Sequence, residues 1–121
     1  MERLTETEEQ LMHIIWSMEK VLIREVLEKL PSPKPPYTTL ASHFRQLEKK
    51  GFLDHLTYGN TYQYFPLVSK EAYQKSSTSQ LINNYFGGSA KNFLSFLVNE
   101  EKLSKEEITE LKKLIEQADK K

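Results

Sequence analysis

The residues best suited to recognise a ligand lie between positions 37 and 50, where a polar face accompanies an apolar one. Leu40, Phe44 and Leu47 repeat at spacings of four and three, which predicts an amphipathic helix with its apolar stripe on a core. The other face offers hydroxyl, amide and cationic groups: Thr38, Thr39, Ser42, Arg45, Gln46 and Lys49. Such groups can reach base edges and phosphates from a DNA major groove, although an ordinary solvated helix face has a similar composition.

Residues 52–58 and 61–65 follow this helix and predict a β-hairpin, because they are rich in Tyr, Thr and Phe. Gly59 and Asn60 separate the two strands and form a two-residue turn signal. We expect Tyr58 and Asn60 at this turn to reach a DNA backbone or minor groove. Two other tyrosines of the hairpin are expected to form cross-strand packing pairs: Tyr62 and Tyr64. A hairpin in this place favours nucleic-acid binding over a merely solvated helix face.

Two shorter helices precede the polar helix. Thr5 and Glu8 form a capping box at the start of a helix over residues 6–18, and residues 24–30 resume helical spacing. Between them, residues 21–23 are long enough for a single strand pairing only. A run of prolines then stops the second helix and keeps the chain extended up to the polar helix. The order helix, short strand, helix, helix, hairpin predicts a winged helix-turn-helix.

This predicted DNA-binding domain covers residues 1–68, and an all-helical segment follows it over residues 69–121. Ser69, Ser89 and Ser104 can each cap a helix, and a pair of glycines separates the first of these three helices from the second. The predicted fold class is therefore mainly α with a small β-hairpin: a winged helix-turn-helix followed by an all-helical dimerisation arm.

The arm is expected to dimerise because it has more apolar surface than it can bury. Its middle helix carries Phe, Leu and Val on nearly every side, and a segment of this length can hardly cover that surface alone. A second copy of the arm is the simplest cover, so we expect a homodimer. The residues expected at its interface are Phe93, Phe96, Leu97, Ile108, Leu111 and Ile115.

The overall composition argues against several other classes of protein. Lys and Arg number 17 and so do Asp and Glu, so no net charge attracts the chain to nucleic acid or lipid, and DNA binding must rest on local pattern. The absence of cysteine rules out disulfides and thiolate chemistry and fits a reducing compartment. No apolar run is long enough for direct membrane insertion, so we expect a cytoplasmic protein.

No set of residues in the sequence predicts catalysis or a cofactor. His13, His43 and His55 fall on three different predicted elements, and none is followed three or four residues later by a histidine or a carboxylate aimed with it at one point. We interpret them as ordinary surface or half-buried residues. The sequence therefore predicts no metal, no cofactor and no enzymatic activity.

The chain resembles the penicillinase-repressor family of winged-helix regulators over nearly its whole length. The resemblance is carried by residues 4–16, 39–51, 62–66, 85–88, 99–104 and 106–108. It implies a transcriptional repressor that binds a palindromic double-stranded DNA operator as a homodimer. It also implies that a membrane-bound sensor releases the operator by triggering proteolysis within the arm.

Three features depart from the family pattern. Family members often carry basic residues where this chain has Ala41 and Gln46, which leaves Arg45 as the best single candidate for a base or phosphate contact. The family's Asn-Phe cleavage bond aligns near Phe96 and Leu97, where no Asn precedes the bond. Copper sensing through the cysteine cluster of one family branch is excluded because the chain has no cysteine.

One alternative stays open at this point, a winged-helix protein-interaction module without specific DNA binding. The zero net charge and the few basic residues on the polar helix motivate it. Salt dependence separates the two functions, because phosphate contacts weaken steeply with added salt and an apolar protein contact does not. A catalytic function is a third and remote interpretation.

Overall fold

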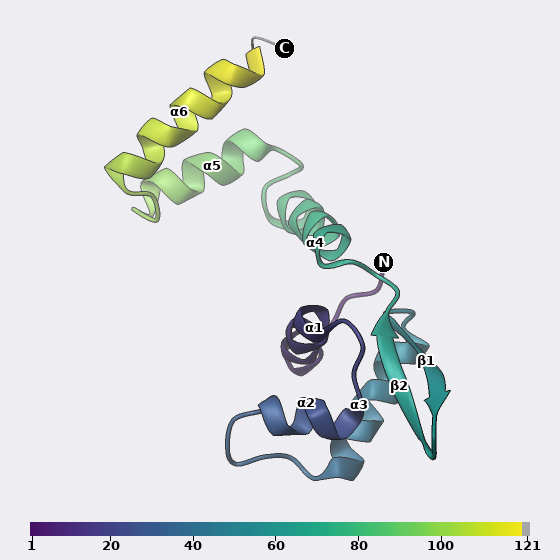
Figure 1. The fold of residues 1–121 in the computed structure, drawn as a ribbon. Coiled ribbons are helices and arrows are strands. Elements are labelled where there is room, and N and C mark those ends of the chain that lie inside the picture. Colours follow the sequence, from purple (N-terminus) through teal and green to yellow (C-terminus); the bar gives the residue numbers. More distant parts are fainter. Residues whose placement is uncertain (120–121) are drawn as a thin grey trace. The chain divides into compact units, whose positions relative to one another are not determined.

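The computed structural model describes residues 1–119, which form six helices and one two-stranded antiparallel sheet (Figure 1). The chain divides into two compact units, Met1–Ser77 and Thr78–Lys121. Within the described part of the chain, no helix combines the length and the apolar composition needed to cross a lipid bilayer.

The first unit begins with helix α1 (Glu6–Met18), which has the predicted bounds. Its start is fixed by the predicted capping box. The Glu8 amide donates to Thr5 Oγ1 at 3.2 Å, and the Thr5 amide donates to Glu8 Oε1 at 2.8 Å. The apolar residues of its buried stripe are Leu11, Met12 and Ile15. The spacing that predicts the helix is thus also the spacing of its core contacts.

Helix α2 (Ile23–Lys29) follows a single strand bridge. Val21 exchanges two backbone hydrogen bonds with Tyr64, at 2.9 and 2.7 Å, so the predicted single pairing is confirmed. The Leu22 amide donates to Glu25 Oε1 at 2.8 Å, which satisfies a backbone donor at the start of α2.

Helix α3 (Tyr37–Lys49) ends in a Schellman motif. The Phe52 amide donates to the Leu47 carbonyl at 3.0 Å, and the Gly51 amide donates to the Glu48 carbonyl at 3.0 Å. Gly51 has φ +86°, a left-handed conformation that glycine adopts without steric cost. The predicted stop of this helix at Gly51 is therefore confirmed.

The strands β1 (Leu53–Tyr58) and β2 (Thr61–Pro66) form the predicted hairpin. Their register leaves only Gly59 and Asn60 in the turn. Gly59 has φ +60°, whereas Asn60 does not have a positive φ. A positive φ at the first turn residue alone is the pattern of a type II′ turn, whose twist matches that of the flanking strands.

One hydrophobic core joins these elements. Phe44 of α3 packs edge-on against Tyr64 of β2, with 4.9 Å between ring centroids. The largest fully buried side chains are Phe44, Phe52, Leu11, Met12, Ile15, Leu40, Leu47, Leu53, Val21 and Val26. Because helix, bridge, helix, helix and hairpin follow in this order around a common core, the predicted winged helix-turn-helix is confirmed.

Helix α4 (Lys70–Tyr85) begins within the first compact unit and ends in the second. Tyr73 is buried, with its ring centroid 5.6 Å from that of Phe52 and 5.9 Å from that of Trp16. The boundary predicted after residue 68 marks the start of α4, but the first turns of this helix pack on the winged unit. A helix cap signals where a helix begins and not which core it joins.

The rest of the second unit consists of α5 (Ala90–Asn99) and α6 (Lys105–Asp119). Each helix of the predicted arm starts at its predicted serine. Ser69 Oγ accepts a hydrogen bond from the Ala72 amide at 3.0 Å and Ser89 Oγ accepts from the Asn92 amide at 3.1 Å. Ser104 and Glu107 form the predicted reciprocal box, at 3.0 and 3.1 Å.

Candidate nucleic-acid interface

Helix α3 has one buried and one exposed face. Leu40, Phe44 and Leu47 are at most 1% exposed and attach the helix to the core. The polar residues predicted to contact DNA are all exposed on the remaining surface: Thr38, Thr39, Ser42, Arg45, Gln46 and Lys49. The winged unit therefore holds this helix by its apolar stripe and presents the polar side chains to solvent.

The exposed face combines two cations with neutral hydrogen-bonding groups. The Arg45 guanidinium can donate two parallel hydrogen bonds to a guanine edge or a phosphate, and Lys49 supplies a point charge. The Gln46 amide and the hydroxyl groups add donors and acceptors for base edges and backbone oxygens. A helix with these groups can both position itself on phosphates and discriminate between bases.

The turn of the hairpin is exposed as well. Tyr58 is 57% exposed at the end of β1, and Asn60 lies in the turn with its side chain in solvent. Residues 53–66 contain no Lys or Arg, so the hairpin offers neutral hydrogen-bonding groups rather than positive charge. A contact made by this wing would therefore depend on hydrogen bonds and stacking.

The other two tyrosines of the hairpin differ from each other. Tyr64 is buried, which confirms its predicted packing role; burial raises the pKa of its phenol, and the Glu48 carboxylate raises it further. Tyr62 is 49% exposed and packs through one ring face, which stacks on the His55 ring with 4.1 Å between centroids. The predicted packing pair at Tyr62 is thus formed, but with one side in solvent.

Two further candidates lie beside the start of α3, and the sequence did not indicate them. A hollow of about 210 Å³ is lined by Leu22, Ile23, Arg24, Tyr37 and Thr61. Arg24 is exposed and Tyr37 is 48% exposed, so a cation and a phenol flank the first turn of the helix. Along the chain Arg24 is simply the polar side of α2, and only folding brings it near the hairpin.

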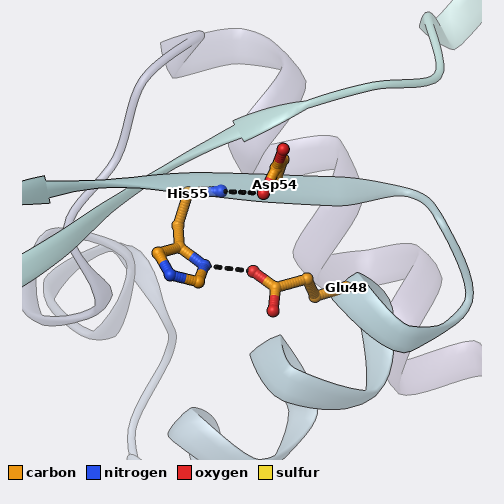
Figure 2. A group of neighbouring side chains, drawn as sticks. All are labelled: Glu48, Asp54 and His55. Carbon is orange, nitrogen blue, oxygen red and sulfur yellow. Dashed lines mark hydrogen bonds and ion pairs between the residues drawn. The ribbon is translucent and has the colours of Figure 1, made fainter.

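A carboxylate and an imidazole meet where α3 reaches the hairpin (Figure 2). His55 Nδ1 faces a Glu48 carboxylate oxygen, and these side chains are 29% and 33% exposed. Asp54 Oδ1 accepts a hydrogen bond from the His55 amide at 2.8 Å. The prediction concerned carboxylates three or four residues after a histidine and did not cover this pair, in which Glu48 precedes His55 by seven positions. It considered helical spacings, whereas these two residues meet because the chain reverses direction at Gly51.

An ion pair between the buried Glu8 and the half-buried Lys50 joins α1 to the end of α3. Lys50 Nζ lies 2.6 Å from Glu8 Oε1 and donates to the Arg3 carbonyl at 3.2 Å. Burial by itself raises the pKa of Glu8, but hydrogen bonds from Lys50 and Thr5 and the Lys50 charge together hold it below its usual 4.5. This pair restrains the C-terminal end of the helix that carries the exposed polar face.

The residues predicted for the dimer interface lie on α5 and α6. Phe93 and Phe96 both approach the Phe86 ring, with centroids 5.2 and 5.5 Å apart. No residue of α5 is buried within one chain, and Phe96 and Ile115 are 46% and 54% exposed. The remaining predicted residues are half-buried: Leu97, Ile108 and Leu111. A single chain therefore does not cover α5 on all sides.

Comparison with known proteins places this arrangement in a family. The family profile described as penicillinase repressor matches residues 4–117, nearly the whole chain. The chain belongs to the penicillinase repressor family. This family member is 29% identical to the penicillinase repressor of Bacillus licheniformis over an alignment 121 positions long, which covers 95% of the chain and 91% of the relative. It is 26% identical to the methicillin resistance regulatory protein MecI of Staphylococcus aureus (strain N315) over 117 residues, covering 93% and 92%.

Solved structures agree with this assignment. The DNA-binding domain of the repressor BlaI matches this penicillinase repressor family member with a TM-score of 0.52 at 25% identity, covering 59% of the chain and 88% of that domain. The oxidised form of MarR from E. coli matches with a TM-score of 0.50 at 16% identity, covering 95% and 75%, and supports the fold alone. Since the family consists of repressors, the prediction that the chain is not an enzyme is confirmed.

Proposed function

We propose that this member of the penicillinase repressor family is a cytoplasmic transcriptional repressor that binds double-stranded DNA. The observation that carries the proposal is the exposed polar face of α3, on a helix whose apolar stripe is fully buried. A rigidly held helix of this kind can enter a major groove without reorganising. The relatives named as repressors, and the likeness to a DNA-binding domain, support this function.

The elements of the winged unit take different roles in this complex. Thr38, Thr39, Ser42, Arg45, Gln46 and Lys49 would contact base edges and phosphates from α3. Tyr58 and Asn60 would contact the neighbouring backbone or minor groove from the wing. Arg24 and Tyr37, which border the hollow beside α3, would add phosphate contacts.

A homodimer formed through the arm would join two such units. The exposed apolar side chains of α5 and α6, Phe96 and Ile115 among them, support a second copy as their cover. A twofold dimer presents two copies of α3, so the matching operator is palindromic, with half-sites one helical turn or a multiple of it apart.

Proteolysis within the arm would release the operator by separating the two half-sites. The bond between Phe96 and Leu97 lies inside α5, and the Phe96 carbonyl accepts a hydrogen bond from the Glu100 amide at 2.9 Å. Proteolysis requires local opening of such a helix, so cleavage there would be slow unless a sensor or protease partner engages the arm. The masses of arm fragments recovered from cells would show whether this bond is cut.

DNA capture tests the proposed function. Sequencing the DNA that full-length protein retains from a fragmented genomic pool should show an enriched inverted repeat. The affinity for this repeat should then fall steeply as salt is added, because bound phosphates release counterions. Retention of no sequence above background would contradict specific DNA binding.

The protein-interaction module is a second candidate, and the wing favours it. The hairpin lacks Lys and Arg yet exposes Leu56 and Tyr58 at 58% and 57%. An apolar surface of this kind suits a protein partner. Captured DNA without sequence preference, together with a protein partner whose binding is insensitive to salt, would favour this function over the repressor.

A further inference from the structure

We propose that Glu48, Asp54 and His55 form a binding site for a divalent transition-metal ion where α3 meets β1 (Figure 2). One ligand atom from each side chain can be chosen so that all three lie within 4.8 Å of one another. An imidazole nitrogen with two carboxylate oxygens is a donor set that suits Zn²⁺, with water completing the coordination.

Two of the three ligands are oriented before an ion binds. The His55 ring stacks on Tyr62 at an interplanar angle of 29° and lies 5.5 Å from the Tyr64 ring. Its Nδ1 faces the Glu48 carboxylate, and the backbone of Glu48 is fixed where its carbonyl accepts a hydrogen bond from the Gly51 amide at the end of α3. Both side chains are partly shielded from solvent, so little of the free energy of ion binding is spent on ordering them.

Asp54 has a weaker part in the site. Its Oδ1 is occupied by the His55 amide at 2.8 Å, and in Figure 2 its carboxylate lies across the strand from the imidazole. One Asp54 carboxylate oxygen still lies within 4.8 Å of the other two ligand atoms, and its remaining lone pairs can accept a hydrogen bond from a water bound to the ion. We therefore expect its loss to matter less than the loss of Glu48 or His55.

The nitrogen ligand decides the class of metal. Ca²⁺ and Mg²⁺ prefer oxygen ligands throughout, whereas imidazole suits Zn²⁺, Ni²⁺ and Cu²⁺. The ion binds the neutral imidazole through Nδ1 while the ring keeps its one proton on Nε2, so a doubly protonated ring must first release a proton to solvent and binding should weaken in acid. The two carboxylates of the site balance the two charges of the ion.

A bound ion would connect the last turn of α3 to the first strand of the wing. This consequence alone rests on the proposed function: if α3 and the wing contact DNA, zinc should raise DNA affinity by restraining one against the other. Binding of the ion itself does not depend on that function, so each can fail separately.

Calorimetric titration of metal-free, full-length protein with Zn²⁺ tests the site. We expect one ion per chain. Glu48→Gln, and His55→Phe, which keeps a ring on Tyr62, should each weaken zinc binding at least about tenfold, with a smaller loss for Asp54→Asn. His13→Phe alters an exposed histidine on α1 and is the matched control, which should bind as the parent does.

Two further measurements distinguish loss of the metal site from loss of the fold. Thermal unfolding should show that zinc raises the Tm of the parent and of His13→Phe but not of Glu48→Gln, and it reports whether each variant is folded. Co²⁺ should give absorption bands that Glu48→Gln abolishes. The site is overturned if the parent binds no zinc, if Glu48→Gln binds it as tightly as the parent, or if His13→Phe loses it.

Discussion

Arg45 and Lys49 supply the positive charge among the polar residues on the exposed face of α3. We expect Arg45→Ala to weaken specific DNA binding by about 1–3 kcal/mol, because a bidentate contact to a base or phosphate is lost. Thermal stability should barely change, since the side chain is exposed. Fluorescence anisotropy with the captured operator measures the affinity, and Lys112→Ala on α6 is the control. Equal affinity of Arg45→Ala and parent would show that α3 is not the reader.

Glu8 makes the free energy of unfolding depend on pH, with stability lost in acid. Its folded pKa lies below its usual 4.5, so between the two values the unfolded chain binds more protons than the folded one. The stabilisation is present above about 4.5 and is lost as the pH falls through the folded pKa.

Glu8→Gln removes this titration together with the charge that faces Lys50. We expect it to cost about 1–3 kcal/mol of unfolding free energy at neutral pH and to flatten the loss of stability in acid. Urea unfolding at several pH values gives both quantities. Glu28→Gln, at an exposed position on α2, should follow the parent; a Glu8→Gln protein that does so too would show that the pair with Lys50 contributes nothing.

At the scale of elements, the hairpin depends on the turn at Gly59. Valine resists the φ of +60° found there, so Gly59→Val should distort the turn, lower the Tm by a few degrees and reduce DNA affinity. Thr57→Val is the matched control, because it places the same side chain at an exposed strand position beside the turn, where valine is well tolerated. Unchanged affinity for Gly59→Val, with an altered hairpin in NMR spectra, would exclude the wing from the DNA contact.

The helices and the hairpin could be predicted because their determinants are local. Thr5, Ser89 and Ser104 bind amides three residues ahead, and the turn at Gly59 needs only its own two residues. The fold of both units follows from such signals together with apolar periodicity.

The site could be predicted only in part, because several of its contacts join distant positions. Glu48 and His55 meet across the chain reversal that ends α3, and Lys50 reaches back 42 residues to Glu8. Arg24 approaches Tyr37 only when α2 packs beside the start of α3. No spacing rule along one element reveals such contacts, whereas the exposed polar residues from Thr38 to Lys49 lie on one helix and follow from its periodicity.

At the scale of the whole molecule, the arm determines the number of DNA-binding units in a particle. Phe96→Asp should give a monomer in sedimentation at micromolar concentration, because dimerisation would bury an unpaired carboxylate. Apparent operator affinity should then fall by about 10²–10⁴, as two half-sites are no longer linked. Ser95→Asp places the same charge on an exposed neighbouring residue of α5 and should stay dimeric. A parent protein that sediments as a monomer would remove the palindromic operator from the proposal.

The attachment of α4 to the winged unit has a spectroscopic consequence. Trp16 is the only tryptophan of the chain, its indole N–H donates to the Val68 carbonyl at 2.8 Å, and its ring neighbours Tyr73. Indole emission responds to solvent, so detachment of the first turns of α4 would shift it to longer wavelength. The protein thus contains an unlabelled optical reporter of this junction, which can follow in real time whether operator binding or proteolysis loosens it.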